Sequence, residues 1–133
     1  MKYLAVLLTA SITLFASPID SYLEQLKKEA IAKDANFKGF DANRGKEIFL
    51  SEHIGKRGKK ISCASCHTNN LSNYGENIFT GKKIKPLSPK ANPKRLTDIK
   101  KVKKWLRRNF KDVYKREGTP QEKGDVLLYI LNN

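Results

Sequence analysis

The feature that most constrains this chain is the run Cys63-Ala64-Ser65-Cys66-His67. Two cysteines separated by two residues, with a histidine directly after the second, are typical of covalent haem attachment. In such a run both thiols add to the haem vinyl groups as thioethers, and the histidine ligates the iron as its fifth ligand. We therefore predict one covalent haem c, held by Cys63 and Cys66, with His67 as the proximal iron ligand.

Two other kinds of cysteine site compete with this interpretation. A thioredoxin-like dithiol would need a preceding strand and a βαβ unit, and the sequence has no pattern for either. A structural zinc site needs about four ligands, and outside the motif the only further histidine is His53. Haem attachment is the better interpretation.

The start of the chain has the pattern of a secretory signal peptide. Lys2 precedes an apolar run that is too short to span a bilayer, and Ala16 supplies the small residue before the expected cleavage site. We predict a signal peptide over residues 1–16, an N-terminal helical extension over 17–36 and a haem domain over 37–133. The predicted location is the periplasm, without stable insertion into a membrane.

The charge of the chain is strongly positive. It has 27 Lys and Arg against 13 Asp and Glu, and loss of Lys2 with the signal peptide leaves 26 against 13, a net charge of +13. Such a balance predicts an acidic partner, and export makes nucleic acid an unsuitable one. The segment from Lys90 to Arg116 holds twelve basic residues and two aspartates. It is either a solvated helix face, a docking face for an acidic redox protein, or a weak contact with an anionic membrane surface.

The spacing of apolar residues predicts an all-α fold. We expect helices over 19–33, from a cap at Asp41 or Asn43 to 50, from 97 to 114, and from a cap at Thr119 with Pro120 in first position to 131. The segment 68–92 is rich in Asn, Gly, Ser and Pro and predicts a long loop. No segment alternates long enough to predict a sheet.

The second axial position of the iron cannot be filled by methionine, because Met1 is the only one and leaves with the signal peptide. Within the predicted 97–114 helix, Asn109 falls in the apolar stripe with Trp105, at the helical advance of roughly 100° per residue. Asn109 is therefore a candidate sixth ligand, unless its amide only bonds backbone near the helix end. The other possibilities are His53, a lysine, water or an empty site, and a surface or supporting role is the commoner one for a histidine such as His53.

Six stretches of the chain together carry a resemblance to a known family: 44–51, 62–67, 80–89, 92–98, 102–109 and 119–128. They resemble the sphaeroides haem protein group of oxygen-binding class I monohaem cytochromes c. The resemblance implies a class I cytochrome c fold over residues 37–133, with helices and a long loop wrapped around one haem. It also implies that Asn109, from the pair Arg108-Asn109, ligates ferric iron and leaves on reduction, which suits a hard, weak donor.

The resemblance carries four further expectations, and the chain departs from it at one point. The carbonyl of Pro86 would accept a hydrogen bond from the His67 ring, and Trp105 would line the distal pocket with Leu106 and Val113. Gly45 and Phe49 would meet Leu128 and Tyr129 where the first and last helices cross. A disulfide known in the family is absent, because Phe110 and Gly118 take its two positions. The redox partner would be a dihaem cytochrome c.

Two functions follow from these residues and this resemblance. The first is a haem protein that accepts electrons and binds a small diatomic ligand such as O2 or NO at the ferrous iron. The second is a simple electron carrier whose haem stays six-coordinate. The sequence favours an electron-transfer or ligand-binding protein over an enzyme, and it leaves open a reductase or oxygenase-type activity on a diatomic species.

Overall fold

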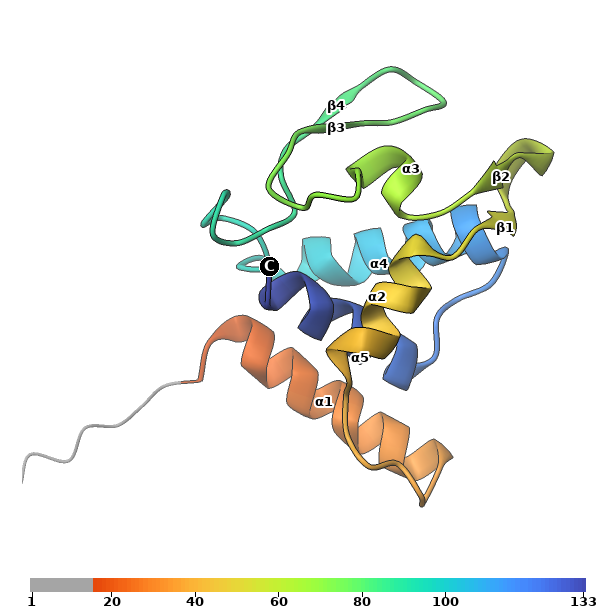
Figure 1. The fold of residues 1–133 in the computed structure, drawn as a ribbon. Helices are drawn as coiled ribbons and strands as arrows, with labels where there is room; N and C mark the ends of the chain where they lie inside the picture. Colours follow the sequence, from red (N-terminus) through yellow and green to blue (C-terminus); the bar gives the residue numbers. More distant parts are fainter. Residues whose placement is uncertain (1–15) are drawn as a thin grey trace, which may run out of the picture.

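The computed structural model describes residues 16–133, which form five helices and two short pairs of strands (Figure 1). The helices are α1 (Pro18–Lys33), α2 (Ala42–Leu50), α3 (Ala64–His67), α4 (Ile99–Tyr114) and α5 (Pro120–Leu131). The antiparallel strand pairs are β1 (His53–Ile54) with β2 (Lys60–Ile61) and β3 (Gly75–Glu76) with β4 (Lys83–Ile84), and the 3-10 turn η1 (Lys56–Gly58) lies between β1 and β2. The predicted helical fold is confirmed.

Helices α1 and α5 begin with reciprocal capping boxes. The Ser17 hydroxyl accepts a hydrogen bond from the backbone N–H of Asp20, and the Asp20 carboxylate accepts one from the backbone N–H of Ser17. Thr119 and Glu122 form the same pair at α5, where Pro120 takes the first helical position. These two helices therefore start within one residue of the positions that the sequence predicts.

Helices α2 and α4 begin with aspartate caps. The carboxylates of Asp41 and Asp98 each accept a hydrogen bond from the backbone N–H three residues later. Of the two caps considered for α2, Asp41 is therefore correct and Asn43 is not. Helix α4 starts at Ile99 rather than Thr97, because Asp98 is the residue that caps it.

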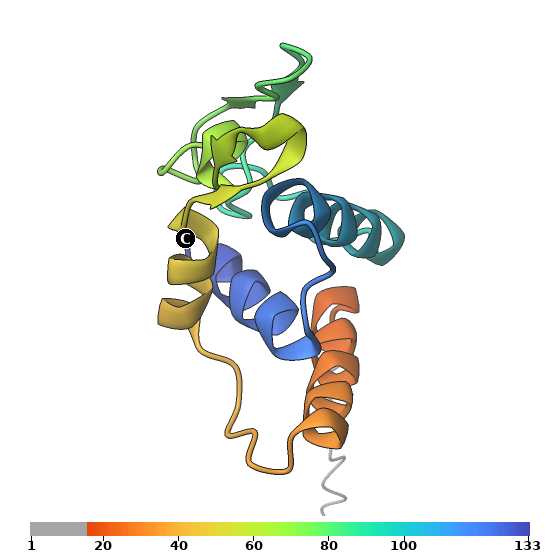
Figure 2. The ribbon, with the colours of Figure 1, turned by 90° about the vertical axis from the view of Figure 1, so that its right-hand side faces the viewer.

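Helices α2 and α5 cross at the centre of the fold (Figure 2). A Cβ at Gly45 would overlap the backbone carbonyl of Asp125 and touch Tyr129, so the crossing requires glycine. The rings of Phe49 and Tyr129 pack with centroids 5.5 Å apart. The buried Asp125 carboxylate accepts hydrogen bonds from Arg44 at 2.9 and 3.1 Å and so ties the two helices together. The expected contact of Gly45 and Phe49 with Tyr129 is confirmed, whereas the one with Leu128 stays a prediction.

Helix α1 packs along α5 and extends the core (Figure 2). Its buried side chains recur at helical spacing, as the sequence predicts, and they are Ile19, Tyr22, Leu26 and Ala30. Leu23, which follows the same helical spacing, is only partly buried. The division into an extension over 17–36 and a domain over 37–133 stays a prediction.

The predicted loop over 68–92 contains the β3–β4 hairpin (Figure 1). Two residues per strand are too few to produce an alternating pattern, so the sequence gives no sign of this hairpin. The loop returns to the core through Ser88, which is fully buried. Its N–H donates to the Leu71 carbonyl at 2.9 Å and its hydroxyl donates to the Asn133 carbonyl at 2.5 Å, so the loop is fixed to the C-terminus.

The predicted signal peptide lies, apart from Ala16, outside the described residues. Among residues 16–133, no helix is long and apolar enough to cross a membrane. The predicted cleavage would leave Ser17, the N-cap of α1, as the first residue. Removal of residues 1–16 stays a prediction.

Candidate haem-binding site

The five motif residues form a single helical turn around α3. The backbone N–H groups of Cys66 and His67 donate to the Cys63 carbonyl at 3.3 and 3.2 Å. The Ser65 hydroxyl accepts a hydrogen bond from the backbone N–H of Ser62 at 2.9 Å and ties the turn to the residue before it. Residues three and four positions apart share a helix face, so Cys66 and His67 each lie next to Cys63 on this turn. Cys63 and His67 line the pocket described next, and Cys66 is not among its lining residues.

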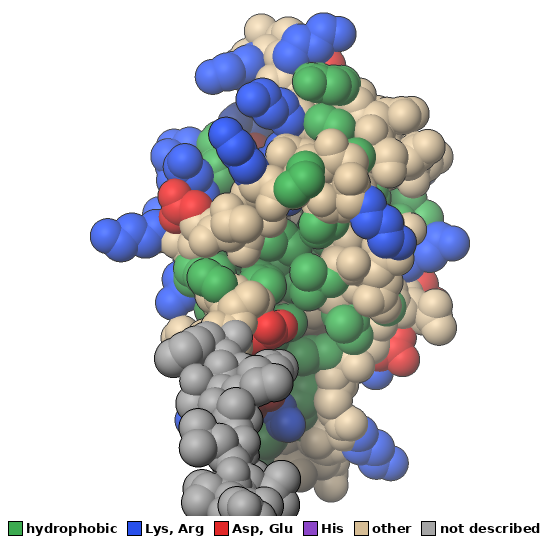
Figure 3. Space-filling view, turned by 90° about the vertical axis from the view of Figure 1, so that its left-hand side faces the viewer, with side chains coloured by type: hydrophobic (Ala, Val, Ile, Leu, Met, Phe, Trp, Pro, Cys, Tyr) green, Lys and Arg blue, Asp and Glu red, His purple; other side chains and the backbone are tan. Residues whose placement is uncertain are grey.

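An apolar pocket lies between α3, α4 and α5. It is lined by Phe49, Cys63, His67, Leu87, Lys94, Arg95, Leu96, Asp98, Lys101, Val102, Trp105, Leu106, Asn109, Phe110, Val126, Leu127 and Ile130. Figure 3 views the side of the molecule on which the loop before α4 and the C-terminus lie, and it shows hydrophobic side chains across this face with Lys and Arg around them. An apolar hollow with a few polar groups is the expected character of a cofactor site.

The His67 ring has the properties of a neutral metal ligand. Burial, and secondarily the charge of Arg95, lowers the pKa of His67 to about 4, so the imidazole is neutral near pH 7. Its Nδ1 atom is buried and has no hydrogen-bond partner within residues 16–133. A buried nitrogen without a partner is unusual, and a neutral imidazole is the form that can ligate a haem iron through its other ring nitrogen.

The two cysteines suit thioether attachment better than the other cysteine sites. Both thiols are free, and burial raises the pKa of Cys63 to about 12, so this thiol is protonated. Within the described part of the chain, no group of three or more Cys, His, Asp or Glu is arranged to hold a metal ion. Both strand pairs are antiparallel, so the described residues lack the βαβ unit of a thioredoxin-like site. The residues present therefore fit a covalent haem.

Asn109 enters the same pocket as His67, from α4. Its amide makes no hydrogen bond within residues 16–133. The end of α4 is instead capped by Lys115, whose left-handed backbone (φ 58°) places its N–H on the Lys111 carbonyl. Asn109 therefore does not have the alternative role of hydrogen bonding to the backbone at the helix end, and its amide is available to bind a ligand.

Trp105 lies at the mouth of the pocket and is 47% exposed. The Lys104 ammonium and the Arg108 guanidinium lie 5.4 and 5.5 Å from its ring centroids. Leu106 lines the pocket as expected, whereas Val113 does not. Val113 is buried one turn beyond Asn109, where α4 passes η1 and β1 rather than the pocket.

The expected hydrogen bond from His67 to Pro86 is not formed. The Pro86 carbonyl accepts from Arg95 Nε at 2.7 Å and from Asn92 Nδ2 at 3.3 Å. Both lone pairs of this carbonyl are therefore used, and Pro86 is absent from the pocket lining, where its neighbour Leu87 stands. The predicted role of Pro86 in the haem site is not supported by these two hydrogen bonds, and it stays a prediction.

His53, the other candidate for the sixth ligand, lies on β1 and not in the pocket. Its Nε2 is 2.8 Å from the Ser51 hydroxyl, and its ring stacks on Tyr114 with centroids 4.1 Å apart. Tyr114 in turn donates its hydroxyl to the Ile48 carbonyl at 2.7 Å. His53 thus supports the end of α4, which is the commoner role expected for it.

Phe110 and Gly118, which take the two positions of the family disulfide, are in contact. A Cβ at Gly118 would lie 2.7 Å from the nearest carbon of the Phe110 ring, so glycine makes room for the ring. The ring is 3% exposed, stacks on Tyr114 at 5.4 Å and lines the pocket directly after Asn109. An apolar contact therefore joins the loop after α4 to the helix where the family has a covalent bond.

Sequence reasoning did not single out several of the pocket residues, among them Arg95 and Leu96. Arg95 lay within a long basic run, where nothing distinguishes a half-buried arginine from an exposed one. Leu96 has a left-handed backbone (φ 61°), which is rare for a residue with a branched side chain. No local signal reveals Arg95 as a pocket residue, because its position depends on hydrogen bonds to the carbonyls of Pro86 and Lys85, nine and ten residues earlier in the loop.

The chain is similar to two characterised cytochromes. It is 44% identical over 87 residues to cytochrome c'' of Methylophilus methylotrophus, covering 65% of this chain and 60% of that protein. It is 43% identical over 90 residues to the cytochrome c-type protein SHP of Cereibacter sphaeroides, covering 68% of this chain and 69% of that protein. The chain thus spans about three fifths of the length of the first relative and about two thirds of the second.

The fold matches solved structures of the same two proteins. Oxidized cytochrome c'' superposes with a TM-score of 0.78 at 34% identity, over 87% of this chain and 94% of that one. Oxidized SHP, an oxygen-binding cytochrome c, superposes with a TM-score of 0.77 at 34% identity, over 90% of this chain and 100% of that one. Fold and motif therefore define a monohaem c-type cytochrome with covalent haem c. The chain belongs to the family described as Domain of unknown function (DUF1924), whose model matches residues 35–130, and its relatives confirm the resemblance to the sphaeroides haem protein group.

Proposed function

We propose that this cytochrome has a reversible sixth ligand, Asn109, and binds a diatomic molecule such as O2 or NO when the iron is ferrous. It accepts electrons from a redox partner in the periplasm. The observation that carries the proposal is that His67 and the free amide of Asn109 line one apolar pocket from α3 and α4. The haem, attached through Cys63 and Cys66, supplies the redox-active iron that these two side chains ligate.

The residues of α4 are suited to a ligand that binds and leaves. An amide is a hard and weak donor, which suits ferric iron and is poorly matched to ferrous iron. Within residues 16–133 the side chain of Asn109 makes no hydrogen bond that would hold it in one position. Its neighbours Leu106 and Phe110 are apolar and buried, so the surroundings suit a small uncharged ligand in place of the amide.

The names of the solved relatives support this proposal. SHP is described as an oxygen-binding cytochrome c. A solution structure of cytochrome c'' is described as giving insights into haem-ligand detachment, and it superposes with a TM-score of 0.76 at 34% identity. An open ferrous site in this chain agrees with both descriptions.

The spectrum of the reduced protein separates this function from simple electron transfer. We expect a high-spin ferrous spectrum that changes promptly when carbon monoxide or nitric oxide is added. A low-spin ferrous spectrum that both gases leave unchanged would show a haem with a permanent sixth ligand, and the protein would then be a simple electron carrier.

The role of Asn109 is tested by Asn109→Ala. We expect loss of the low-spin ferric spectrum with both thioether bonds intact, because alanine has no donor atom. The matched control is Asn36→Ala in the exposed turn between α1 and α2, which should keep the wild-type spectrum. An unaltered ferric spectrum in Asn109→Ala would remove this residue from the proposal.

The exposed face of α4 is the proposed docking surface for an acidic redox protein, a dihaem cytochrome c. Its basic side chains without an ion-pair partner among residues 16–133 are Lys100, Lys103, Lys104, Arg107, Arg108 and Lys111. We expect the association rate with such a partner to fall at least about tenfold as salt screens this surface. Lys104→Glu should slow association, whereas Lys27→Glu on α1 should not, and a rate independent of salt would contradict the docking proposal.

Export to the periplasm is tested at the N-terminus of the mature protein. Cleavage after Ala16 predicts that N-terminal sequencing of the secreted haem protein begins at Ser17. A mature chain that still begins at Met1 would contradict both the cleaved signal peptide and the loss of the only methionine.

A further inference from the structure

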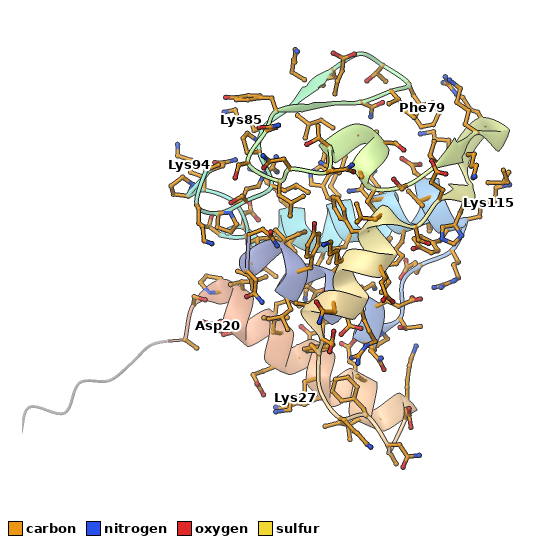
Figure 4. The ribbon with its side chains drawn as sticks, viewed as in Figure 1. Asp20, Lys27, Phe79, Lys85, Lys94 and Lys115 are labelled. Atoms are coloured by element: carbon orange, nitrogen blue, oxygen red, sulfur yellow. The ribbon has the colours of Figure 1, made fainter. Side chains whose placement is uncertain are left out.

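Arg95 is a half-buried cation in the wall of the haem pocket. Its Nε donates to the Pro86 carbonyl at 2.7 Å, and its Nη2 donates to the Lys85 carbonyl at 2.6 Å. The guanidinium is thus fixed in position by the loop that precedes α4. Figure 4 shows Lys85 and Lys94 on the same side of the molecule, which is the side where this loop runs.

The guanidinium of Arg95 has hydrogen-bond donors that the loop carbonyls do not use. It carries five N–H groups in a planar fork, and two hydrogen bonds to carbonyls leave three of them free. Within residues 16–133 no carboxylate lies within ion-pair distance of it, since Asp98, the one acidic residue of the pocket lining, pairs with Lys101 at 3.5 Å and caps α4. A partly desolvated cation without a counter-charge is unfavourable, so this position calls for an anion.

The charges of the pocket lining define that anion. Lys94, Arg95 and Lys101 are three cations against the single carboxylate of Asp98, which leaves a net charge of +2. A haem brings two propionate carboxylates, and a carboxylate is the partner that matches the fork of a guanidinium. The left-handed backbone of Leu96 places an apolar side chain in the pocket directly beside Arg95, so adjacent residues offer an apolar and a cationic contact to the same group.

We infer that Arg95 binds a propionate carboxylate of the haem through the N–H groups that the Lys85 and Pro86 carbonyls leave free. Arg95 is then a positioning residue that joins the loop before α4 to the haem. Its positive charge also keeps the propionate ionised, so the reduction potential does not change with pH. This inference rests on the haem pocket described above, but it does not depend on Asn109 being the sixth ligand.

The test compares Arg95→Gln with Arg57→Gln in the holoprotein. Arg57 is exposed on η1, outside the haem pocket, and its replacement removes the same charge. The reduction potential of each variant is measured between about pH 5 and about pH 8, the range in which a raised carboxyl pKa becomes visible. Wild type and Arg57→Gln should give a flat profile. Arg95→Gln should give a potential that rises as the pH falls, because the propionate, without its partner, takes up a proton more readily when the iron is reduced.

A merely structural role of Arg95 would give a different result. Loss of the bonds to Lys85 and Pro86 would lower the urea midpoint but leave the pH profile flat, and this outcome would overturn the inference. Arg95→Lys keeps the charge without the fork, so it should fold and show a shallower rise than Arg95→Gln. If Arg95→Gln yields no holoprotein, a flat profile in Arg95→Lys equally overturns the inference. The ferric spectrum, which reports on Asn109, should stay low-spin in both variants.

Discussion

The contact of Phe110 with Gly118 offers the sharpest prediction for stability. The perturbation is Gly118→Ala, made once in the wild type and once in Phe110→Ala. In the wild type the new Cβ would lie 2.7 Å from the nearest ring carbon and within 2.9 Å of two others, whereas carbon atoms ordinarily pack at about 3.5–4.0 Å. The ring cannot move aside easily, because Tyr114 and the haem pocket lie on its other sides.

The magnitude follows from two opposing effects. Overpacking of this kind costs about 1–3 kcal/mol. The φ of Gly118 lies outside the left-handed region, so an alanine there should gain about 0.4–1 kcal/mol by restricting the unfolded chain once the ring is gone. The effect of Gly118→Ala should therefore change sign between the two backgrounds, with a coupling free energy of about 1.4–4 kcal/mol.

The assay is urea unfolding of the four holoproteins, namely wild type, both single variants and the double variant. Phe110→Ala alone should cost about 3–5 kcal/mol, since it removes a buried ring. The urea midpoints should shift while the slope of the unfolding free energy against urea concentration stays constant, which shows that only the stability has changed. Equal effects of Gly118→Ala in both backgrounds would refute the idea that this ring and this glycine form the contact that joins the loop to α4.

Three further variants test other contacts. Gly45→Ala should lower stability by about 1–3 kcal/mol in thermal unfolding, because its Cβ would overlap the Asp125 carbonyl at the crossing of α2 and α5. Asp125→Asn should cost about 1.5–3 kcal/mol in urea, since it removes the charge that accepts two hydrogen bonds from Arg44. Hydrogen bonding to Arg116 lowers the pKa of Glu122 in the folded protein. The ionised carboxylate therefore stabilises the fold above the unfolded carboxyl pKa, and this stabilisation is lost as the pH falls through the lower folded pKa. In Glu122→Gln the free energy of unfolding should fall less steeply at acid pH, and an unchanged pH dependence would contradict the role of Glu122.

The sequence alone predicts those features that depend on neighbouring residues. The haem motif, the caps at Asp41 and Thr119 and the apolar stripe of α4 all arise from residues within a few positions of one another. Their geometry is determined by the helical turn and by local hydrogen bonds. Elimination of methionine as a ligand needs only composition, given cleavage of the leader. For this reason the helical fold and the attachment of haem c were predictable, and the relatives confirm both.

Only the tertiary structure decides which of the predicted residues meet. The Pro86 carbonyl was expected to serve His67, but Arg95, nine residues further along the chain, takes it. Val113 shares the stripe of Asn109 and yet faces away from the pocket. These outcomes depend on how the long loop folds back on α4, and a loop without periodicity carries no local information on its path. The sequence therefore fixes the chemistry of the iron's proximal side, whereas packing between distant segments determines the pocket on the other side.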